Sequence, residues 1–450
     1  MDVEAAISIA DTLIFQKTGK HLDTLQTNIF RSSWLGEKYE KIAEQNYCSD
    51  SHIKMLGANL WENLSIALNE KVTKKNFRAV LERQNRTLTN FSEVKQSHNP
   101  TKLLVAPKIE LELPEGRVPL GSPFYVKRPN IEHQCDRTIL KPGALIRIKA
   151  PRQMGKSSLM VRAIDYATQA GYHTVTIDFQ LADRKIFEDF DLFLKWFCIS
   201  ITRKLALPNR INEYWDDIFG SKMSCKDYVE NYLLTQLEQP LVLALEEVDL
   251  LFQYAELADD FFALLRSWHE EAKSSLIWQK LRLIIAHSTE VYIPLNINQS
   301  PFNVGLPLEL TEFRSEQILD LAIRHGLDWN SSQVEKLVKM VGGHPFLVRI
   351  ALYNLAQQKQ TLEQLFAVAT TETSPFNHNL RRHLWQLRKQ PELARSLKTV
   401  LTSTSSVRLE PIIMFKLHSM GLVRLQGNEV TPRCELYRLY FKDRLQNYDE

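Results

Sequence analysis

The chain has 450 residues, about three times the usual length of one domain, so we expect two to four domains. Its composition, with 44% hydrophobic and 24% charged residues, is that of a globular protein and excludes a disordered, collagen-like or fibrous chain. The formal net charge is only +3, which argues against bulk electrostatic capture of nucleic acid but leaves room for a local basic patch.

The beginning of the chain and the cysteines bear on its compartment. The sequence MDVEAAISIADTLIFQ is acidic without a basic leader region, and no apolar run approaches the ~18 residues of a membrane span. The five cysteines lie far apart, without CxxC spacing or the density of a disulfide scaffold. We therefore expect a cytoplasmic protein that is neither secreted nor integral to a membrane.

Residues 1–84 show helical periodicity and no convincing strand. Two apolar helices flank the polar turn Asn46–Asp50, which is a helix-turn-helix pattern. A basic stretch follows on the last predicted helix: Lys71, Lys74, Lys75, Arg78 and Arg83. These side chains could meet phosphates, but a solvated helix face explains them equally well, because no base-reading residue can be identified.

The rest of the chain predicts a linker and three further parts. The polar, Pro-bearing residues 85–119 predict an interdomain linker. Residues 120–312 predict a core in which helices alternate with apolar strands at 143–150, 173–179, 241–246, 281–287 and 304–310. Such alternation is typical of an α/β fold with a parallel sheet. Residues 313–374 predict a helical lid.

Residues 375–450 predict helices followed by a small hairpin. Gly421 ends a helix, and Gly427-Asn428 makes the turn between two short strands. Helices followed by a hairpin suggest a winged helix. The expected architecture is thus a multidomain α/β protein with a P-loop core, a lid, an N-terminal helix-turn-helix-like domain and a C-terminal winged-helix-like domain.

A phosphate-binding loop follows the first strand. The strand leads directly into Ala150, Pro151, Arg152, Gln153, Met154, Gly155, Lys156, Ser157 and Ser158, and then into an apolar helix. The amides of such a loop bind a β-phosphate at a helix N-terminus, and Gly155 lets the backbone approach closely. Lys156 supplies charge to the β- and γ-phosphates, and the Ser157 hydroxyl is a ligand for Mg²⁺.

This loop departs from the GxxxxGK[ST] pattern at its first position, where Ala150 replaces glycine. A methyl group is tolerable there if φ is negative, although the backbone of the loop then has fewer accessible conformations. A chance GKSS after a strand is the alternative interpretation, and the next motif makes that alternative weaker.

An acidic strand end lies roughly ninety residues after the loop. Leu241–Leu245 is apolar and is followed by Glu246, Glu247 and, after Val248, Asp249. One carboxylate must orient the Mg²⁺ shell and its neighbour must polarise the attacking water, so we assign Glu246 to the metal and Glu247 to the water. Asp is usual at the first position, which puts the Mg²⁺ geometry in doubt and leaves Asp249 as a substitute. The alternative interpretation is an acidic strand end that is exposed to solvent and has no role in binding.

The next strand, LRLIIAH, ends in His287-Ser288-Thr289-Glu290. A polar side chain there can sense a γ-phosphate between the two motifs, and Ser288 or Thr289 fits that role. Either residue could equally cap the strand.

Several segments together resemble a known family. PFYVKRP, GALIRIKAPRQMGKSSL, PLVLALEEVDLLF, LIIAHSTEVYIPL and GGHPFLV resemble the AAA-like domain of cyanobacterial proteins, within the STAND group of signal-transduction NTPases. The segments YEKIAEQNYCSD and LWENLSIALNEKVTKKNFRAVLE resemble the helix-turn-helix domain at the N-termini of vWA-MoxR-associated proteins. The resemblance implies an ATP-driven switch whose flanking domains bind partners.

The same resemblance implies further nucleotide contacts. The segment ahead of the P-loop strand would contact the base through Tyr125, Val126 and Arg128. A Gly-x-Pro motif of the lid maps onto Gly343, His344 and Pro345. From the residues alone, Gly342–Pro345 is only a break between two helices.

Other candidates have weaker support. Arg266 and His269 could act across a subunit interface, but an exposed surface stripe explains them better. Trp61, Trp196, Trp268 and Trp385 sit at apolar helical positions and are predicted to be core residues.

Three functions remain. The first is an ATP-binding and slowly hydrolysing switch that controls its flanking domains, with Mg²⁺ and ATP or ADP as ligands and a nucleotide-dependent homo-oligomer as one outcome. The second is a nucleotide-binding adaptor or DNA-binding regulator with little hydrolysis, which Ala150 and Glu246 favour. The third, an AAA+ motor, lacks a clear second arginine sensor in the lid. Protein partners are expected more than DNA.

Overall fold

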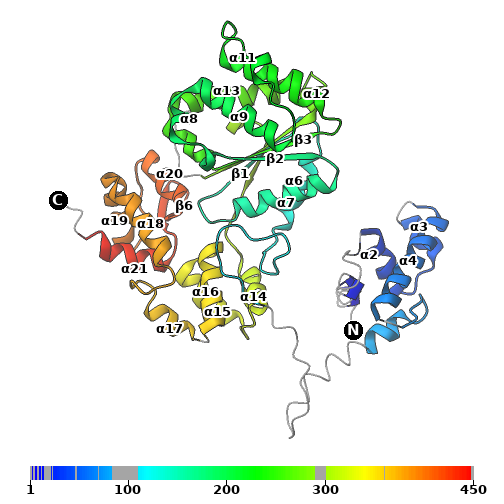
Figure 1. Ribbon diagram of the computed structural model, residues 1–450. Helices are drawn as coiled ribbons and strands as arrows, with labels where there is room; N and C mark the ends of the chain where they lie inside the picture. Colours follow the sequence, from blue (N-terminus) through cyan, green and yellow to red (C-terminus); the bar gives the residue numbers. More distant parts are fainter. Residues whose placement is uncertain are drawn as a thin grey trace. The chain divides into compact units, whose positions relative to one another are not determined.

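The computed structural model describes residues 24–45, 48–68, 70–83, 110–288, 301–358 and 360–446, with scattered residues before position 24 (Figure 1). The chain divides into two compact units, Met1–Ala106 and Pro107–Glu450. Throughout these described ranges, every helix is too short or too polar to cross a membrane.

The N-terminal unit is helical, as predicted. Its helices include α2 (Thr24–Trp34), α3 (Tyr39–Gln45), α4 (Asp50–Leu68) and a last helical segment at 77–83. Phe30, Trp61 and Phe77 pack together, with ring centroids of Trp61 and Phe77 4.6 Å apart. The indole N–H of Trp61 donates a hydrogen bond to the Tyr39 hydroxyl at 2.8 Å, which ties α3 to α4.

The basic stretch of this unit lies differently from the prediction. Lys71, Lys74 and Lys75 precede the last helix, because the chain turns at residues 74–76 before the helix starts at Phe77. The Lys74 ammonium donates to the Glu37 carbonyl at 2.7 Å and lies 3.7 Å from the centroid of the Tyr39 ring. Arg83, on the helix, forms an ion pair with Glu70. Part of the stretch therefore serves the unit's own packing.

A five-stranded parallel sheet forms the centre of the second unit. Its strands are β1 (Leu145–Lys149), β2 (His173–Asp178), β3 (Leu241–Glu246), β4 (Leu281–His287) and β5 (Leu306–Glu309), in the order β2-β3-β4-β1-β5. All pairs are parallel. Each of the five apolar runs predicted to be a strand is one, and the parallel arrangement is confirmed.

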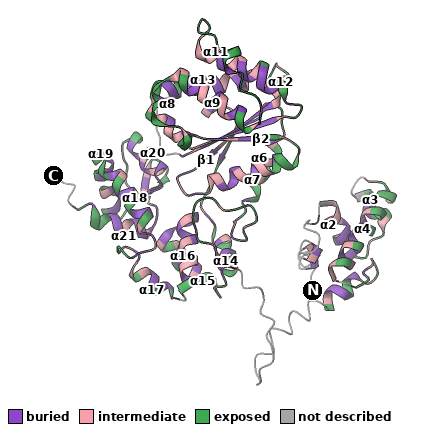
Figure 2. Cartoon of the chain, in the orientation of Figure 1, coloured by how far each residue is buried: buried purple, intermediate pink, exposed green. Residues whose placement is uncertain are grey.

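Helices cover both faces of the sheet. They are α6 (Pro129–Ile139), α7 (Lys156–Gln169), α8 (Arg184–Glu188), α9 (Phe190–Lys204), α10 (Ile211–Tyr214), α11 (Gly220–Asp227), α12 (Leu234–Gln236) and α13 (Ala255–Glu271). Because side chains alternate along a strand, Leu243 and Ile285 pack with α9 and α13, whereas Val242 and Ile284 pack with α6 and α7. Figure 1 shows α9 and α13 on one side of the sheet and α6 and α7 on the other. Strands β3 and β4 are buried except at their last residues, Glu246 and His287. In Figure 2 the strands of the central sheet are mostly in the colour of buried residues. The sheet is therefore open to ligands at its carboxyl end.

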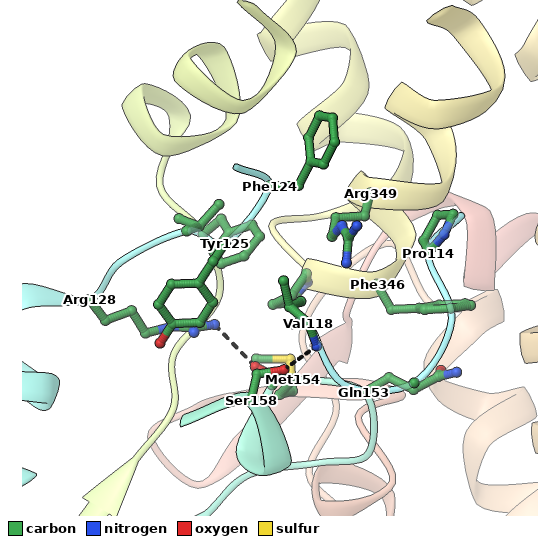
Figure 3. Close-up of a pocket in the computed structure, with 15 residues that line it drawn as sticks. Pro114, Val118, Phe124, Tyr125, Arg128, Gln153, Met154, Ser158, Phe346 and Arg349 are labelled. Atoms are coloured by element: carbon green, nitrogen blue, oxygen red, sulfur yellow. Dashed lines mark hydrogen bonds between the residues drawn. The ribbon is translucent and has the colours of Figure 1, made fainter. Parts of the chain in front are cut away.

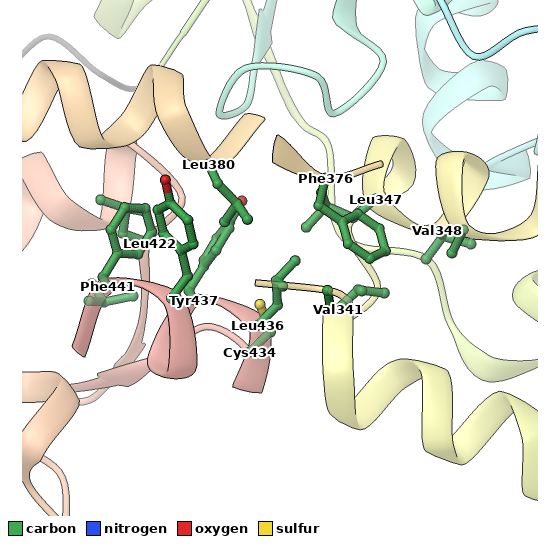
Figure 4. Packing of buried hydrophobic residues seen from close by; sticks show 14 of the residues in the cluster. Val341, Leu347, Val348, Phe376, Leu380, Leu422, Cys434, Leu436, Tyr437 and Phe441 are labelled. Carbon is green, nitrogen blue, oxygen red and sulfur yellow. The ribbon is translucent and has the colours of Figure 1, made fainter. Parts of the chain in front are cut away.

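The chain after the sheet is mostly helical. The lid region holds α14 (Ser315–Arg324), α15 (Ser331–Val341), α16 (Pro345–Gln358) and α17 (Leu362–Ala367). The C-terminal region holds α18 (Asn377–Arg388), α19 (Pro391–Thr402), α20 (Pro411–Ser419), β6 (Val423–Gln426), β7 (Glu429–Pro432) and α21 (Glu435–Arg444). One hydrophobic core runs through both regions, with Val341 and Leu347 of the lid in the same cluster as Phe376 and Leu436 (Figure 4). The lid and the C-terminal helices are thus packed as one body.

The predicted C-terminal hairpin is confirmed. Strands β6 and β7 pair antiparallel from Val423↔Pro432 to Gln426↔Glu429, and Gly427 takes a left-handed φ of 61° in the turn. The winged-helix assignment of the region stays a prediction. Trp385 was expected in the core but is 60% exposed, with the Lys389 ammonium 3.5 Å from its ring centroid.

Gly305, just before β5, provides a test of the close packing between β5 and β1. Its φ is +72°, and a Cβ there would overlap the carbonyl oxygen of Leu145 in β1. Gly171 has a similar φ of +85° but open space around it. Gly171→Ala should cost about 1–2 kcal/mol for the left-handed backbone alone. Gly305→Ala should cost about 1–3 kcal/mol more because β5 must move away from β1. Chemical denaturation of the two variants measures the difference, and equal losses would contradict the close approach.

Candidate functional site

The phosphate loop connects β1 to α7 and has the backbone that its sequence suggests. Gly155, which precedes α7 directly, has a left-handed φ of 99°. Gln153 is also left-handed, with φ 62°. Ala150 is fully buried and is not among the described residues with positive φ, so its methyl group is accommodated as expected. The loop therefore places the amides of the first turn of α7 at the carboxyl end of the sheet.

A cavity of about 480 Å³ lies in front of this loop. It is lined by Gly116, Arg117, Arg152, Gln153, Gly155, Lys156, Ser157, Ser158, Asp178, Gln180, Glu246, Glu247, Ser288 and Arg382. The loop motif, the acidic strand end and Ser288 were predicted separately from the sequence, and the structure brings them into one cavity. We call it the phosphate cavity.

Lys156 is the cation at the centre of this arrangement. Its ammonium donates to the carbonyl oxygens of Ala150 at 3.0 Å and Pro151 at 3.1 Å, and to the Ser288 hydroxyl at 3.3 Å. The last contact connects the loop to the end of β4. Lys156 therefore lies between the phosphate loop and Ser288, the residue that follows β4.

Ser288 is fixed by Asp249. Both carboxylate oxygens of Asp249 accept from the Ser288 amide at 2.9 Å. This contact lets Asp249 position Ser288, and its alternative role as a metal ligand stays a prediction. Burial lowers the pKa of the neighbouring His287 to about 4. Thr289, the other predicted sensor, lies outside the described residues.

Glu246 and Glu247 stand at the end of β3. Glu246 is the last strand residue and lies beside Asp178 of β2 in the parallel register. Glu247 leaves the strand with a left-handed φ of 56°, which turns the chain sharply at this point. Burial raises the pKa of the Glu247 carboxyl, while the nearby Arg152 and Lys156 act in the opposite direction.

A second, smaller cavity of about 140 Å³ adjoins the first and shares Gly116, Gln153, Gly155 and Ser158 with it. Its wall is mainly apolar and is completed by Pro114, Val118, Phe124, Tyr125, Val126, Arg128, Met154, Phe313, Pro345, Phe346 and Arg349 (Figure 3). We call it the base cavity. All three residues that the family resemblance placed near a base, Tyr125, Val126 and Arg128, line it.

Residues 110–118, which we call the leading segment, cross both cavities. The Val118 amide donates to the Ser158 hydroxyl at 2.9 Å (Figure 3). Arg162 donates to the Val118 carbonyl at 3.1 Å. Gly116 lines both cavities. The sequence places these residues in a linker, but they are a wall of the site. Ser158 accordingly holds this wall as well as closing the loop motif.

Two arginines border the base cavity. Arg128 donates to the Met154 carbonyl at 3.1 Å and lies 4.9 Å from the centroid of the Phe313 ring. Arg349 of α16 is buried and lies 3.8 Å from a carboxylate oxygen of Glu112. The lid thus presents an arginine to the site, although no such residue was identified from the sequence.

The Gly343-His344-Pro345 motif lies between the base cavity and the phosphate loop. Pro345 lines the base cavity. The Gly343 carbonyl accepts from the Phe313 amide at 2.8 Å, and a side chain at Gly343 would collide with Phe313. His344 is buried and its ring contacts the backbone of Arg152, so the motif braces the phosphate loop from behind.

Three further residues singled out in the sequence, Pro151, Arg266 and His269, contact other parts of the chain outside the two cavities. Pro151 faces the C-terminal region, within 3.3 Å of the place where a Cβ on Gly421 would lie. His269 Nδ1 lies 2.9 Å from the Gly143 carbonyl, and Arg266 contacts Asn303. Both contacts are internal to the chain.

Asp178, Gln180, Arg117 and Arg382 were missed by sequence reasoning. Asp178 had a usable signal, because it is a polar residue at the end of an apolar strand next to β3 in the sheet. Arg117 and Arg382 had none, since each reaches the cavity from a segment that carries no motif.

Family models match both parts of the chain. The AAA-like domain model matches residues 113–443. The chain belongs to this AAA-like domain family. The model of the vWA-MoxR associated protein N-terminal HTH matches residues 1–84 and agrees with the helices of the first unit. The resemblances to the AAA-like domain and to the N-terminal helix-turn-helix domain are confirmed.

Individual relatives are distant. An uncharacterized WD repeat-containing protein of Synechocystis is 25% identical over 296 residues, which are 63% of this chain and 24% of that protein. The chain thus spans about a quarter of this cyanobacterial relative. The Walker-type ATPase of Pyrococcus abyssi is 14% identical, with a TM-score of 0.49, covering 71% of this chain and 96% of the other. The ORC2 protein of Aeropyrum pernix is 16% identical, with a TM-score of 0.45, covering 72% and 93%.

His344 makes the packing behind the loop sensitive to acid. Burial lowers its pKa from 6.5 to about 3, and Arg433 and Arg382 act in the same direction. The unfolded chain therefore binds more protons than the folded chain below pH 6.5, so stability is complete above that pH and is lost as the pH falls toward 3. At pH 5.5 this one residue should cost about 1.4 kcal/mol.

The His344→Gln variant should lose that part of the pH dependence. Denaturation at pH 7.5 and pH 5.5 measures it, with the exposed His133→Gln as control. A parental difference between the two pH values in His344→Gln would show that His344 is not buried in its neutral form.

Proposed function

We propose that the chain is an ATP-binding switch of the STAND type, which hydrolyses ATP slowly and thereby controls its flanking domains. The observation that carries this proposal is the single cavity lined by Lys156 and Ser157 of the loop, Glu246 and Glu247 of β3, and Ser288 of β4. The adjoining base cavity, with Tyr125 and Pro345, has room and apolar surface for a planar base.

The residues present fit a Mg²⁺ ion. Ser157 offers a hydroxyl and Glu246 a carboxylate from the same cavity, and hard oxygen donors of this kind suit Mg²⁺ together with phosphates. The ion would neutralise charge on the phosphates. Lys156 would bind the phosphates, and Ser288, held by Asp249, would orient a hydroxyl toward them. Glu247 would accept a proton from the attacking water.

The flanking domains are proposed to carry the partners. We expect protein partners of the N-terminal helix-turn-helix domain and the C-terminal winged-helix-like region more than DNA. The engagement of Lys74 with Tyr39 and of Arg83 with Glu70 supports this order, because both cations already have partners within the unit. Nucleotide-dependent assembly of several copies is compatible with the switch.

A nucleotide-binding adaptor with little or no hydrolysis is the second candidate. The observations that favour it are Ala150 in place of the first loop glycine and Glu246 in place of the usual aspartate. Both candidates bind nucleotide, and only the first hydrolyses it. A substitution of Lys156 therefore tests nucleotide binding, and a substitution of Glu247 tests hydrolysis.

Replacing Lys156 should abolish tight nucleotide binding. Lys156→Ala removes a main charge-assisted contact to phosphate, so affinity for Mg-ATP should fall at least tenfold. Titration with a fluorescent ATP analogue measures this, and Lys149→Ala is the control because that exposed lysine lies at the end of β1. Unchanged affinity of Lys156→Ala would overturn the assignment of the phosphate loop.

Replacing Glu247 should separate hydrolysis from binding. Glu247→Gln should lower turnover by roughly 10²-fold or more while binding persists, since a general base is lost. Its raised pKa should also place the acid limb of the pH–rate profile above the 4.5 of an ordinary glutamate, because only the ionised carboxylate accepts a proton. Steady-state phosphate release measures both. Parental turnover in Glu247→Gln would transfer the role to Glu246, and no turnover in the parent chain would favour the adaptor.

A further inference from the structure

Arg382 reaches the phosphate cavity from the C-terminal region. It lies on α18, more than two hundred residues after the loop, and lines the same cavity as Lys156, Glu247 and Ser288. The neighbouring Arg381 is directed elsewhere, since it pairs with Glu372 on an exposed part of the surface. Two adjacent arginines of one helix therefore have different surroundings, and one of them faces the site.

A hydrogen-bond chain holds this face of α18 on the phosphate loop. The Gln153 side-chain oxygen accepts from Asn379 Nδ2 at 2.7 Å and lies 3.4 Å from an Arg382 guanidinium nitrogen. The Asn379 oxygen in turn accepts from the Tyr437 hydroxyl at 3.1 Å, and Tyr437 is buried in the core of the C-terminal region. Gln153 is the non-glycine residue of the loop with a left-handed φ. The loop conformation and the position of α18 are thus linked.

The charges that line the phosphate cavity indicate that the ligand of Arg382 is an anion. Arg117, Arg152, Lys156 and Arg382 line it together with Asp178, Glu246 and Glu247. The three acids lie at the ends of β2 and β3, where a metal ion would sit. The four cations leave a site of positive character for a polyanion, and a guanidinium is well suited to bind a phosphate with two parallel hydrogen bonds.

We propose that Arg382 binds the terminal phosphate of ATP from within the same chain and so lets the C-terminal region distinguish ATP from ADP. The inference rests on the proposed function of the cavity. Because the lid and the C-terminal helices share one hydrophobic core, Arg382 moves together with that whole body. The presence of the terminal phosphate would therefore hold the body against the loop, and its loss would remove that contact.

A positional role through Gln153 alone is the competing explanation, and the two roles predict different results. If Arg382 only braces the loop, its removal should weaken ATP and ADP binding equally, because the loop is proposed to bind the β-phosphate that both nucleotides carry. If it binds the terminal phosphate, ATP binding should suffer selectively.

The test compares Mg-ATP and Mg-ADP affinities of the parent chain with those of Arg382→Ala, Arg382→Lys and the control Arg381→Ala. Arg382→Ala should weaken ATP binding roughly ten- to a hundredfold, as expected for a lost charged hydrogen bond, with ADP changed less than about threefold. Arg382→Lys should recover part of the ATP affinity, and Arg381→Ala should match the parent.

Equal losses for both nucleotides, or no loss for either, in Arg382→Ala would overturn this inference while leaving the nucleotide site intact. Failure of the parent chain to bind either nucleotide would overturn the proposed function and this inference with it. Circular dichroism establishes that each variant is folded. Should Arg382→Ala unfold, the same comparison with Arg382→Gln decides the question, because glutamine keeps a hydrogen-bond donor for Gln153 but carries no charge.

Discussion

The parallel pairing of the central strands brings together the phosphate loop, the acidic end of β3 and Ser288. Strand β1 lies between β4 and β5, with Lys149 beside His287 on one side and Glu309 on the other. The phosphate loop that follows β1 must therefore emerge next to Ser288, and the pairing of β2 with β3 sets Asp178 beside Glu246. Ligands of open α/β sheets bind at the carboxyl ends of the strands, where the strand order reverses. In this chain the strand order reverses at β1, because its two neighbours in the sheet, β4 and β5, come last among the five strands in the sequence.

Much of the sheet and of the phosphate cavity could be predicted from the sequence, because the relevant signals are local. A run such as Leu241–Leu245 identifies a buried strand from its composition, and GKS after a strand identifies the loop by its spacing. The hairpin turn at Gly427-Asn428 is a signal of the same kind. Each requires only a few adjacent residues, and tertiary packing has little freedom to override them.

The remaining features depend on contacts between distant segments. The sequence offers Asp249 as a metal ligand, but only the fold shows that its carboxylate accepts from the Ser288 amide. Trp385 lies at an apolar helical position, yet the partners that cover α18 leave that face open. Arg382 and the leading segment reach the cavities from outside any motif. Their roles follow from how the lid and the C-terminal helices pack in one core, which no local pattern encodes.

The leading segment has a mechanical consequence. It is covalently continuous with the residues that come from the N-terminal unit, and it forms part of the wall of both cavities through Gly116. Tension on the chain between the units therefore acts on that wall, and the hydrogen bond from Val118 to Ser158 is one of the contacts that would bear the load. Ser158 directly follows Lys156 and Ser157, the two residues proposed to bind phosphate and Mg²⁺, so a pull on the chain would act within one helical turn of the proposed phosphate site.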